Sequence, residues 1–178
     1  MTELYSKTDI ITALEGKYAQ LIHWLEQHDD HRFEVAPIEG KWSCGQHVEH
    51  LILSTKPLRT AMKMPYVMLG QLFGKKNERP ERSYEEVVAK YRLKLSQGGR
   101  APSEYEPKQV ENNQKAALLA QLQRELDQLC SIIETWKEDK MSIYLLPHPL
   151  IGKMTIREIL LFTIYHTEHH TNALRNGY

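Results

Sequence analysis

Apolar side chains recur every three or four residues over four long stretches of the chain, with polar residues between them. This spacing is typical of amphipathic helices, because it places the apolar positions on one face. The clearest case has leucines at positions 119, 122, 126 and 129. The four predicted helices span residues 9–27, 43–64, 113–137 and 156–175.

Three predicted helix starts carry a capping box, in which a Ser or Thr side chain and a Glu or Gln three residues later bond each other's backbone N–H groups. The pairs are Ser43 with Gln46, Ser83 with Glu86, and Thr155 with Glu158. The first and last pairs open the second and fourth long helices. The middle pair predicts a short helix over residues 84–95.

The segments between the predicted helices are rich in glycine and proline. Residues 65–108 form a long insertion that predicts mainly loops around the short helix, with a solvated charge run at residues 75–79. Residues 141–155 also predict an irregular connection, and no period-two strand pattern of any length appears. The expectation is an all-α fold, with one domain over residues 1–178: a four-helix bundle with a loop-rich insertion between its second and third helices.

Composition narrows the class of protein. Of 178 residues, 41% are hydrophobic and 26% charged, and 23 basic residues balance 23 acidic ones. The even charge disfavours a nucleic-acid partner, and no apolar run is long enough for a membrane span. The N-terminus has no secretory pattern, so we expect a cytoplasmic location. Cys44 and Cys130 are expected to be reduced core residues rather than a disulfide.

Nine histidines are the unusual feature, and two of them occupy the apolar face of the fourth helix. His166 and His170 continue the line of Ile159 and Thr163, at steps of four residues or three. Two imidazoles one turn apart can both point at one divalent ion. His169 lies about 100° away on the flank of the helix and is expected to be a nearby or surface residue.

Other interpretations of this histidine pair stay open at this point. Both rings could hydrogen-bond inside the bundle or face solvent at the end of the helix, without any metal. The run His-Thr-Glu-His-His does not match the His-Glu-x-x-His of zinc peptidases, because its glutamate is not next to the first histidine. No histidine has a glutamate three residues before it, which disfavours di-iron carboxylate chemistry.

A third ligand has to come from another helix, and His47 and His50 on the second helix are the candidates. A helical wheel favours His47, which lies about 60° from the centre of the apolar face, over His50 at about 120°. The difference is not decisive, because the buried arc of a bundle helix is wide.

The two histidine segments resemble those of a known family. Trp42-Ser43, Gly45-Gln46 and His50-Leu51, followed much later by His166 and His170, are similar to the motifs of DinB-like proteins, which include bacillithiol transferases and metal-dependent hydrolases. The resemblance implies a four-helix bundle holding one divalent metal on three histidines, here His50, His166 and His170. It makes His50 rather than His47 the ligand, because His50 is followed by leucine, and His47 becomes a neighbour in the cavity.

Three imidazoles leave coordination positions open, as in catalytic metal sites, and imidazole suits zinc or nickel equally. The resemblance favours a metal-dependent transferase that joins a low-molecular-weight thiol to a small-molecule substrate. The alternatives are a metal-dependent hydrolase and a non-catalytic bundle stabilised by its metal. Whether the chain is an enzyme stays open on the sequence alone, and so does the homodimer that relatives often form.

Overall fold

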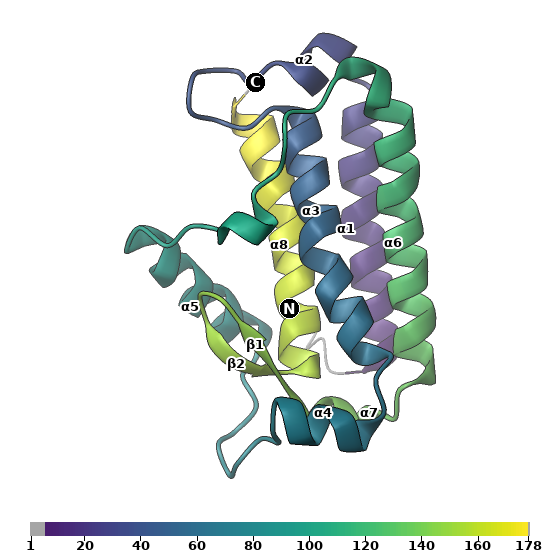
Figure 1. Cartoon of the computed structure of the whole chain (residues 1–178), viewed down its shortest axis with the longest axis vertical. Coiled ribbons are helices and arrows are strands. Elements are labelled where there is room, and N and C mark those ends of the chain that lie inside the picture. The colour runs from purple at the N-terminus through teal and green to yellow at the C-terminus, as the bar shows by residue number, and fades with distance from the viewer. Residues whose placement is uncertain (1–5, 178) are drawn as a thin grey trace.

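The computed structural model describes residues 6–177, and its architecture is a bundle of four long helices (Figure 1). The bundle confirms the all-α expectation, and each predicted long helix is present within a few residues of its expected ends. The long helices are α1 (Lys7–Glu26), α3 (Cys44–Met62), α6 (Lys115–Thr135) and α8 (Ile156–Gly177).

The bundle has an uncommon connectivity. Both α1 and α3 pack against α6 and α8, while Figure 1 shows α1 and α8 running in one direction and α3 and α6 in the other. Because α3 and α6 are parallel neighbours, the chain between them must return along the whole bundle. The long insertion that the sequence contains is this return connection.

The return connection covers the side of the bundle formed by α3 and α8. It contains α4 (Tyr66–Leu72), the predicted short helix α5 (Tyr84–Ser96) and two single turns, η1 (Ser103–Tyr105) and η2 (Asn112–Gln114). Helix α5 packs against α8, and η1 contacts α3. The sequence analysis missed α4, because a helix of two turns is too short to show a hydrophobic period.

All three predicted capping boxes are present. The hydroxyl oxygen of Ser43 accepts from the Gln46 N–H at 3.2 Å, and the Gln46 side chain accepts from the Ser43 N–H at 3.0 Å. The same reciprocal bonds join Ser83 to Glu86 at the start of α5 and Thr155 to Glu158 at the start of α8. These caps set where α3 and α8 begin, and therefore where their histidines lie along the axis of the bundle.

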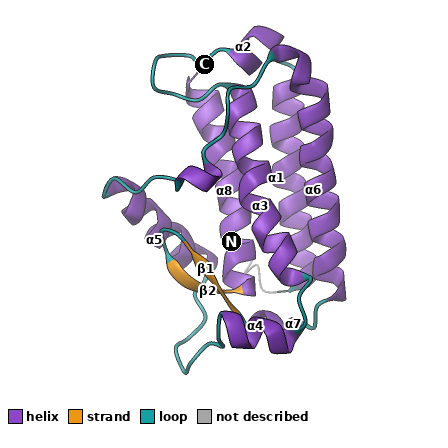
Figure 2. Cartoon of the chain, viewed as in Figure 1, coloured by secondary structure: helices purple, strands orange, loops and turns teal. Residues whose placement is uncertain are grey.

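The segment before α8 corrects the expectation of an irregular connection. It forms a β-hairpin of β1 (Leu145–His148) and β2 (Gly152–Thr155), paired antiparallel with His148 opposite Gly152. Figure 2 shows the hairpin beside α5. Two four-residue strands with a proline in the first give too little alternation to detect in a sequence. Two further short helices, α2 (Asp30–Glu34) and α7 (Glu138–Met141), join the ends of the bundle.

The charge run at residues 75–79 is a loop in which Lys75, Asn77 and Glu78 are exposed, as the sequence predicted, but Arg79 is half-buried and makes a specific contact. Arg79 forms two hydrogen bonds to Glu158, at 2.7 and 2.8 Å, and the Glu158 side chain is fully buried. Arg82 also contacts this carboxylate, through its backbone N–H and its guanidinium. A long-range ion pair therefore fastens the return connection to the first turn of α8.

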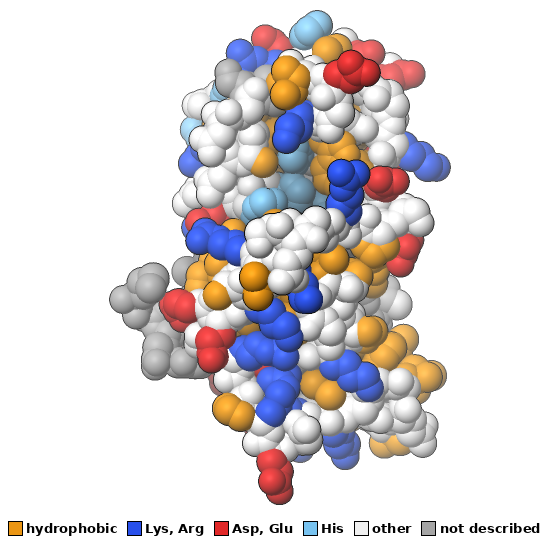
Figure 3. Space-filling view, turned by 90° about the vertical axis from the view of Figure 1, so that its left-hand side faces the viewer, with side chains coloured by type: hydrophobic (Ala, Val, Ile, Leu, Met, Phe, Trp, Pro, Cys, Tyr) orange, Lys and Arg blue, Asp and Glu red, His pale blue; other side chains and the backbone are white. Residues whose placement is uncertain are grey.

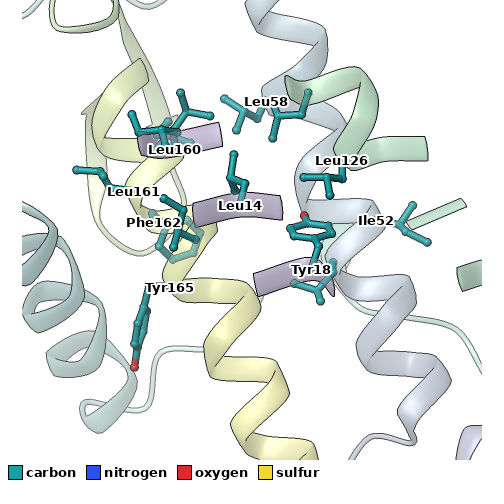
Figure 4. Close-up of a cluster of buried hydrophobic side chains, with 14 of the residues drawn as sticks. Leu14, Tyr18, Ile52, Leu58, Leu126, Leu160, Leu161, Phe162 and Tyr165 are labelled. Atoms are coloured by element: carbon teal, nitrogen blue, oxygen red, sulfur yellow. The ribbon is translucent and has the colours of Figure 1, made fainter. Parts of the chain in front are cut away.

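The core runs along the bundle axis. Figure 4 shows Leu14 and Tyr18 of α1 lying among side chains of α3, α6 and α8. The Tyr18 hydroxyl lies 3.2 Å from the Thr55 hydroxyl, which joins α1 to α3 inside the core. Cys44 and Cys130 are both buried, as the prediction of core residues requires. Within residues 6–177, every helix is too short or too polar to cross a bilayer.

Candidate metal centre

The structure brings the three histidines named by the motif together at the interface of α3 and α8. His50 lies on α3 and His166 and His170 lie on α8, and all three side chains are buried. One ring nitrogen of each can be chosen so that all three lie within 4.8 Å of one another. The group fits a three-histidine site that could hold a metal ion.

The Nε2 atoms are the ones that converge. His166 Nε2 lies 3.2 Å from His50 Nε2 and 3.0 Å from His170 Nε2. Three nitrogens at these separations can share one ion, whose bonds to imidazole are about 2.0–2.1 Å long for zinc. The pair from α8 supplies two nitrogens because residues four apart lie one above the other on a helix.

The return connection fixes the orientation of His50. Its Nδ1 lies 2.7 Å from the backbone carbonyl oxygen of Tyr105, the last residue of η1. A carbonyl oxygen only accepts, so Nδ1 must carry the proton and donate it. The Nε2 lone pair of neutral His50 is therefore free to bind an ion. Metal-ligating histidines commonly have such a carbonyl partner on their other nitrogen.

His47 belongs to the same cluster through a different contact. Its Nδ1 lies 2.7 Å from His170 Nδ1, on the side of the His170 ring away from the convergent nitrogens. The helical wheel favours His47 over His50, but His47 is only half-buried, whereas His50 is buried and is the histidine of this helix that joins the convergent group. His47 is therefore the hydrogen-bond partner of His170 on the nitrogen that does not converge with the other two histidines.

Trp42 lies over the cluster from the residue before the Ser43 cap. Its ring centroid is 4.9 Å from that of His50, and it is nearly parallel to the His170 ring at 6.1 Å. The large apolar ring excludes water from one side of the histidines. This contact gives a physical reason for a tryptophan at the head of the motif.

The remaining polar residues of this turn of α8 lie outside the cluster. His169 is half-buried on the flank, where its ring lies 5.9 Å from that of Tyr91. Glu168 forms an ion pair with Lys17 of α1 at 2.7 Å. Neither belongs to the convergent group, as the spacing predicts.

Burial keeps the cluster neutral. Loss of hydration, followed by repulsion from neighbouring imidazoles, lowers the pKa of His166 and His170 well below the ordinary value. The same causes lower the pKa of His47 to about 4. Neutral imidazole is the form that ligates metal, so these histidines are prepared for an ion at neutral pH.

A cavity of about 220 Å³ adjoins the cluster, and His50 and His166 form part of its wall. Figure 3 shows histidine side chains at the bottom of a hollow on this face. Among the residues that the structure describes, no Asp, Glu, Lys or Arg lines this cavity. The other residues around the cavity come from α3, α8, the return connection and the hairpin, and they are mainly aliphatic, aromatic and proline side chains.

The sequence analysis missed His148, which lies on β1 and also lines the cavity. Its Nδ1 accepts hydrogen bonds from the backbone N–H groups of Leu150 and Ile151, at 3.1 and 3.2 Å. Burial lowers its pKa to about 4, so it too is neutral. Only its position between two prolines, Pro147 and Pro149, sets it apart in the sequence.

Three solved structures are similar to this chain over nearly their whole length. TT2238, described as a four-helix bundle protein, has 17% identity and a TM-score of 0.60, and the match covers 96% of this chain and 99% of that one. YfiT from Bacillus subtilis, described as a probable metal-dependent hydrolase with an unusual four-helix bundle topology, has 16% identity and a TM-score of 0.58, covering 100% and 91%.

The third structure is the colibactin self-resistance protein ClbS in complex with double-stranded DNA, with 19% identity, a TM-score of 0.58 and coverage of 97% and 95%. At these identities the likeness establishes the fold. No curated protein matches the sequence. The family model of the DinB superfamily matches residues 13–174, a span that includes all three convergent histidines, and the chain therefore belongs to the DinB superfamily.

Proposed function

We propose that this chain binds one divalent metal ion, zinc or nickel, on His50, His166 and His170, and transfers a low-molecular-weight thiol to an electrophilic small molecule in the adjoining cavity. The observation that carries the proposal is that the convergent Nε2 atoms adjoin an apolar cavity, of which His50 and His166 are walls. A three-histidine site with room beside it is typical of catalytic rather than structural metal centres.

The lining of the cavity favours a thiol over water as the nucleophile. A bound divalent ion would lower the pKa of a coordinating thiol or water toward about 7, or below it for a thiol. No carboxylate of residues 6–177 lines the cavity to act as a general base. A thiol loses its proton more readily than water does, so it depends less on a general base.

In the proposed step the thiol S–H proton passes to solvent. The sulfur electron pair forms a bond to an electrophilic carbon of the substrate, and the bond from that carbon to its leaving group breaks, with the pair going to the leaving group. The chain orients the ligating rings through Tyr105 and His47 and excludes water with Trp42 and the apolar walls. A location in the cytoplasm, where small thiols are reduced, is part of this proposal.

Metal binding is tested by elemental analysis of the purified protein and by titration with zinc and nickel. We expect about one ion per chain, lost in His50→Ala, His166→Ala and His170→Ala. Full retention of the ion in all three variants would contradict the assignment of ligands.

The reaction is tested with L-cysteine and monochlorobimane, whose carbon–chlorine bond breaks as a fluorescent thioether forms. The metal-loaded protein should accelerate conjugation beyond metal and thiol alone, and His50→Ala should not. A metal-loaded protein that leaves conjugation unchanged would overturn the transferase proposal.

Metal-dependent hydrolysis is the second candidate, favoured by the description of YfiT. Metal-stimulated release of nitrophenol from p-nitrophenyl acetate, without thiol conjugation, would support it. If metal only raised the melting temperature, the non-catalytic bundle would be the better account. The expectation of no nucleic-acid partner stays a prediction, since ClbS was solved with DNA; it is checked by a gel shift with double-stranded DNA at moderate salt.

A further inference from the structure

The hairpin places a further histidine, His148, on the wall of the cavity. It lies on a different element from the three candidate ligands and is not part of their cluster. His148 is half-buried at the end of β1, and its ring packs edge-on against Phe162 of α8 with centroids 4.3 Å apart. It lines the same cavity as His50 and His166. Its ring therefore borders the space in which a substrate would lie.

The turn of the hairpin fixes which nitrogen of His148 carries the proton. Two backbone N–H groups, of Leu150 and Ile151, both donate to Nδ1. An N–H group only donates, so Nδ1 must be the bare acceptor of the neutral ring and Nε2 must carry the proton. Within residues 6–177, Nε2 has no hydrogen-bond partner.

The serine and threonine hydroxyl groups around the cavity are already engaged, which leaves the hydroxyls of Tyr91 and Tyr105 as the other side-chain O–H groups of the described lining. Ser54, Thr55 and Thr163 each donate to a carbonyl of the preceding turn of their own helix. A largely apolar cavity with a few polar groups, here including the Nε2–H of His148, is the common form of a small-molecule site, in which those groups fix orientation.

We propose that His148 is a substrate-positioning residue, whose Nε2–H donates a hydrogen bond to an uncharged oxygen acceptor, such as a carbonyl, on an otherwise apolar substrate. A neutral donor in a cavity without charged walls selects a ketone, ester or amide oxygen rather than a carboxylate or phosphate. This inference deepens the proposed function, because it names the substrate class of the same cavity.

The first test is the protonation state of the ring. In protein labelled with ¹⁵N-histidine, two-bond ¹H–¹⁵N correlation spectra at pH 7.5 should show His148 with a bare Nδ1 and a protonated Nε2. The spectra are taken on zinc-supplemented and chelator-treated protein, and the same tautomer is expected in both. A proton on Nδ1 would overturn the proposal.

The second test is binding of a matched pair of probes, acetophenone and α-methylstyrene, which differ in having C=O or C=CH₂ at the same position. His148→Asn keeps a side-chain oxygen to accept from the turn but removes the donor at the position of Nε2. We expect His148→Asn to weaken acetophenone binding by about 2- to 10-fold, as for loss of one hydrogen bond, and to leave α-methylstyrene unchanged.

His148→Gln places an amide donor near the position of Nε2 and should restore part of the preference for acetophenone. Equal weakening of both probes, or no change for either, would overturn the role of His148. Neither probe contains a thiol, a leaving group or a hydrolysable bond, so this outcome is independent of whether the metal-dependent transferase activity is found.

Discussion

The Nδ1 atom of His47 lies 2.7 Å from the Nδ1 atom of His170. If His170 presents the lone pair of Nε2 to an ion, its Nδ1 carries the ring proton and donates it to His47. The lone pair of His47 Nδ1 then acts as the acceptor, and the proton of His47 resides on its Nε2. His47, which lies outside the convergent group, therefore helps to determine which nitrogen of His170 carries the proton.

We therefore expect His47→Ala to weaken zinc binding without abolishing it. Losing the partner of a metal-ligating histidine typically costs about 10- to 100-fold in affinity. Competition against a zinc-chelating dye measures the change, with His50→Ala as the reference for loss of a ligand. An affinity loss from His47→Ala as large as that from His50→Ala would place His47 among the ligands.

A second prediction separates the three histidines at the end of α8. His166→Ala and His170→Ala should each remove one of three protein bonds to the ion, whereas His169→Ala should retain the metal, because its ring lies on the flank beside Tyr91. Elemental analysis of the three purified variants checks this. Similar metal loss from all three would show that the direction of the rings on α8 does not decide ligation.

Most of the architecture, and the histidine pair of α8, can be predicted from the sequence. Periodic apolar positions predict the four long helices, since burial of one face is the main force that forms them. The capping residues at Ser43, Ser83 and Thr155 predict where three helices begin, because these bonds are local. Helical spacing pairs His166 with His170, but only the family resemblance adds His50, because the helical wheel by itself prefers His47.

The features that the sequence does not disclose depend on contacts between distant segments. The partner of His50 is a backbone carbonyl, at Tyr105, and a backbone group leaves no mark in residue type. The ion pair of Arg79 and Glu158 joins residues far apart in the chain. His148 acquires its fixed tautomer only because a hairpin folds, and each strand is only four residues long.

A third prediction concerns the tight start of α3. A Cβ atom at Gly45 would lie 2.7 Å from the Phe33 carbonyl oxygen and 2.7 Å from a methyl group of Val110. Gly45→Ala should lower the free energy of unfolding by about 1–3 kcal/mol, as overpacking does. Gly16→Ala is the control, because nothing lies within 4 Å of its Cβ and helix propensity should make it neutral or stabilising. Urea denaturation measures both, and a stabilised Gly45→Ala would contradict the close contact.

A fourth prediction concerns the Glu158 ion pair. Burial by itself would raise the pKa of this carboxyl, but hydrogen bonds from Arg79, the Arg82 backbone and the Thr155 backbone outweigh it and lower the pKa. Glu158→Gln should reduce the free energy of unfolding by about 1–3 kcal/mol at pH 7. A carboxyl with a lowered folded pKa stabilises above its unfolded pKa of about 4.3. The difference between wild type and Glu158→Gln should therefore shrink as the pH falls below that value.

The last prediction concerns His148, which gains a positive charge on protonation, whereas Glu158 loses a negative one. Burial lowers its pKa from the ordinary 6.5 to about 4 in the folded protein, so between these values the unfolded chain binds more protons than the folded one. By linkage the free energy of unfolding then falls as the pH drops from about 6.5 to about 4, and is unaffected by this group above that window. The contribution of His148 should be about 1–3 kcal/mol.

His148→Asn removes the titrating ring while keeping an acceptor for the Leu150 and Ile151 N–H groups, so it isolates the effect from those of the other histidines. Urea denaturation of chelator-treated wild type and variant at pH 7.5 and pH 5 should show a smaller loss of stability in the variant on acidification; an equal loss in both would mean that His148 titrates as freely in the folded protein as in the unfolded chain.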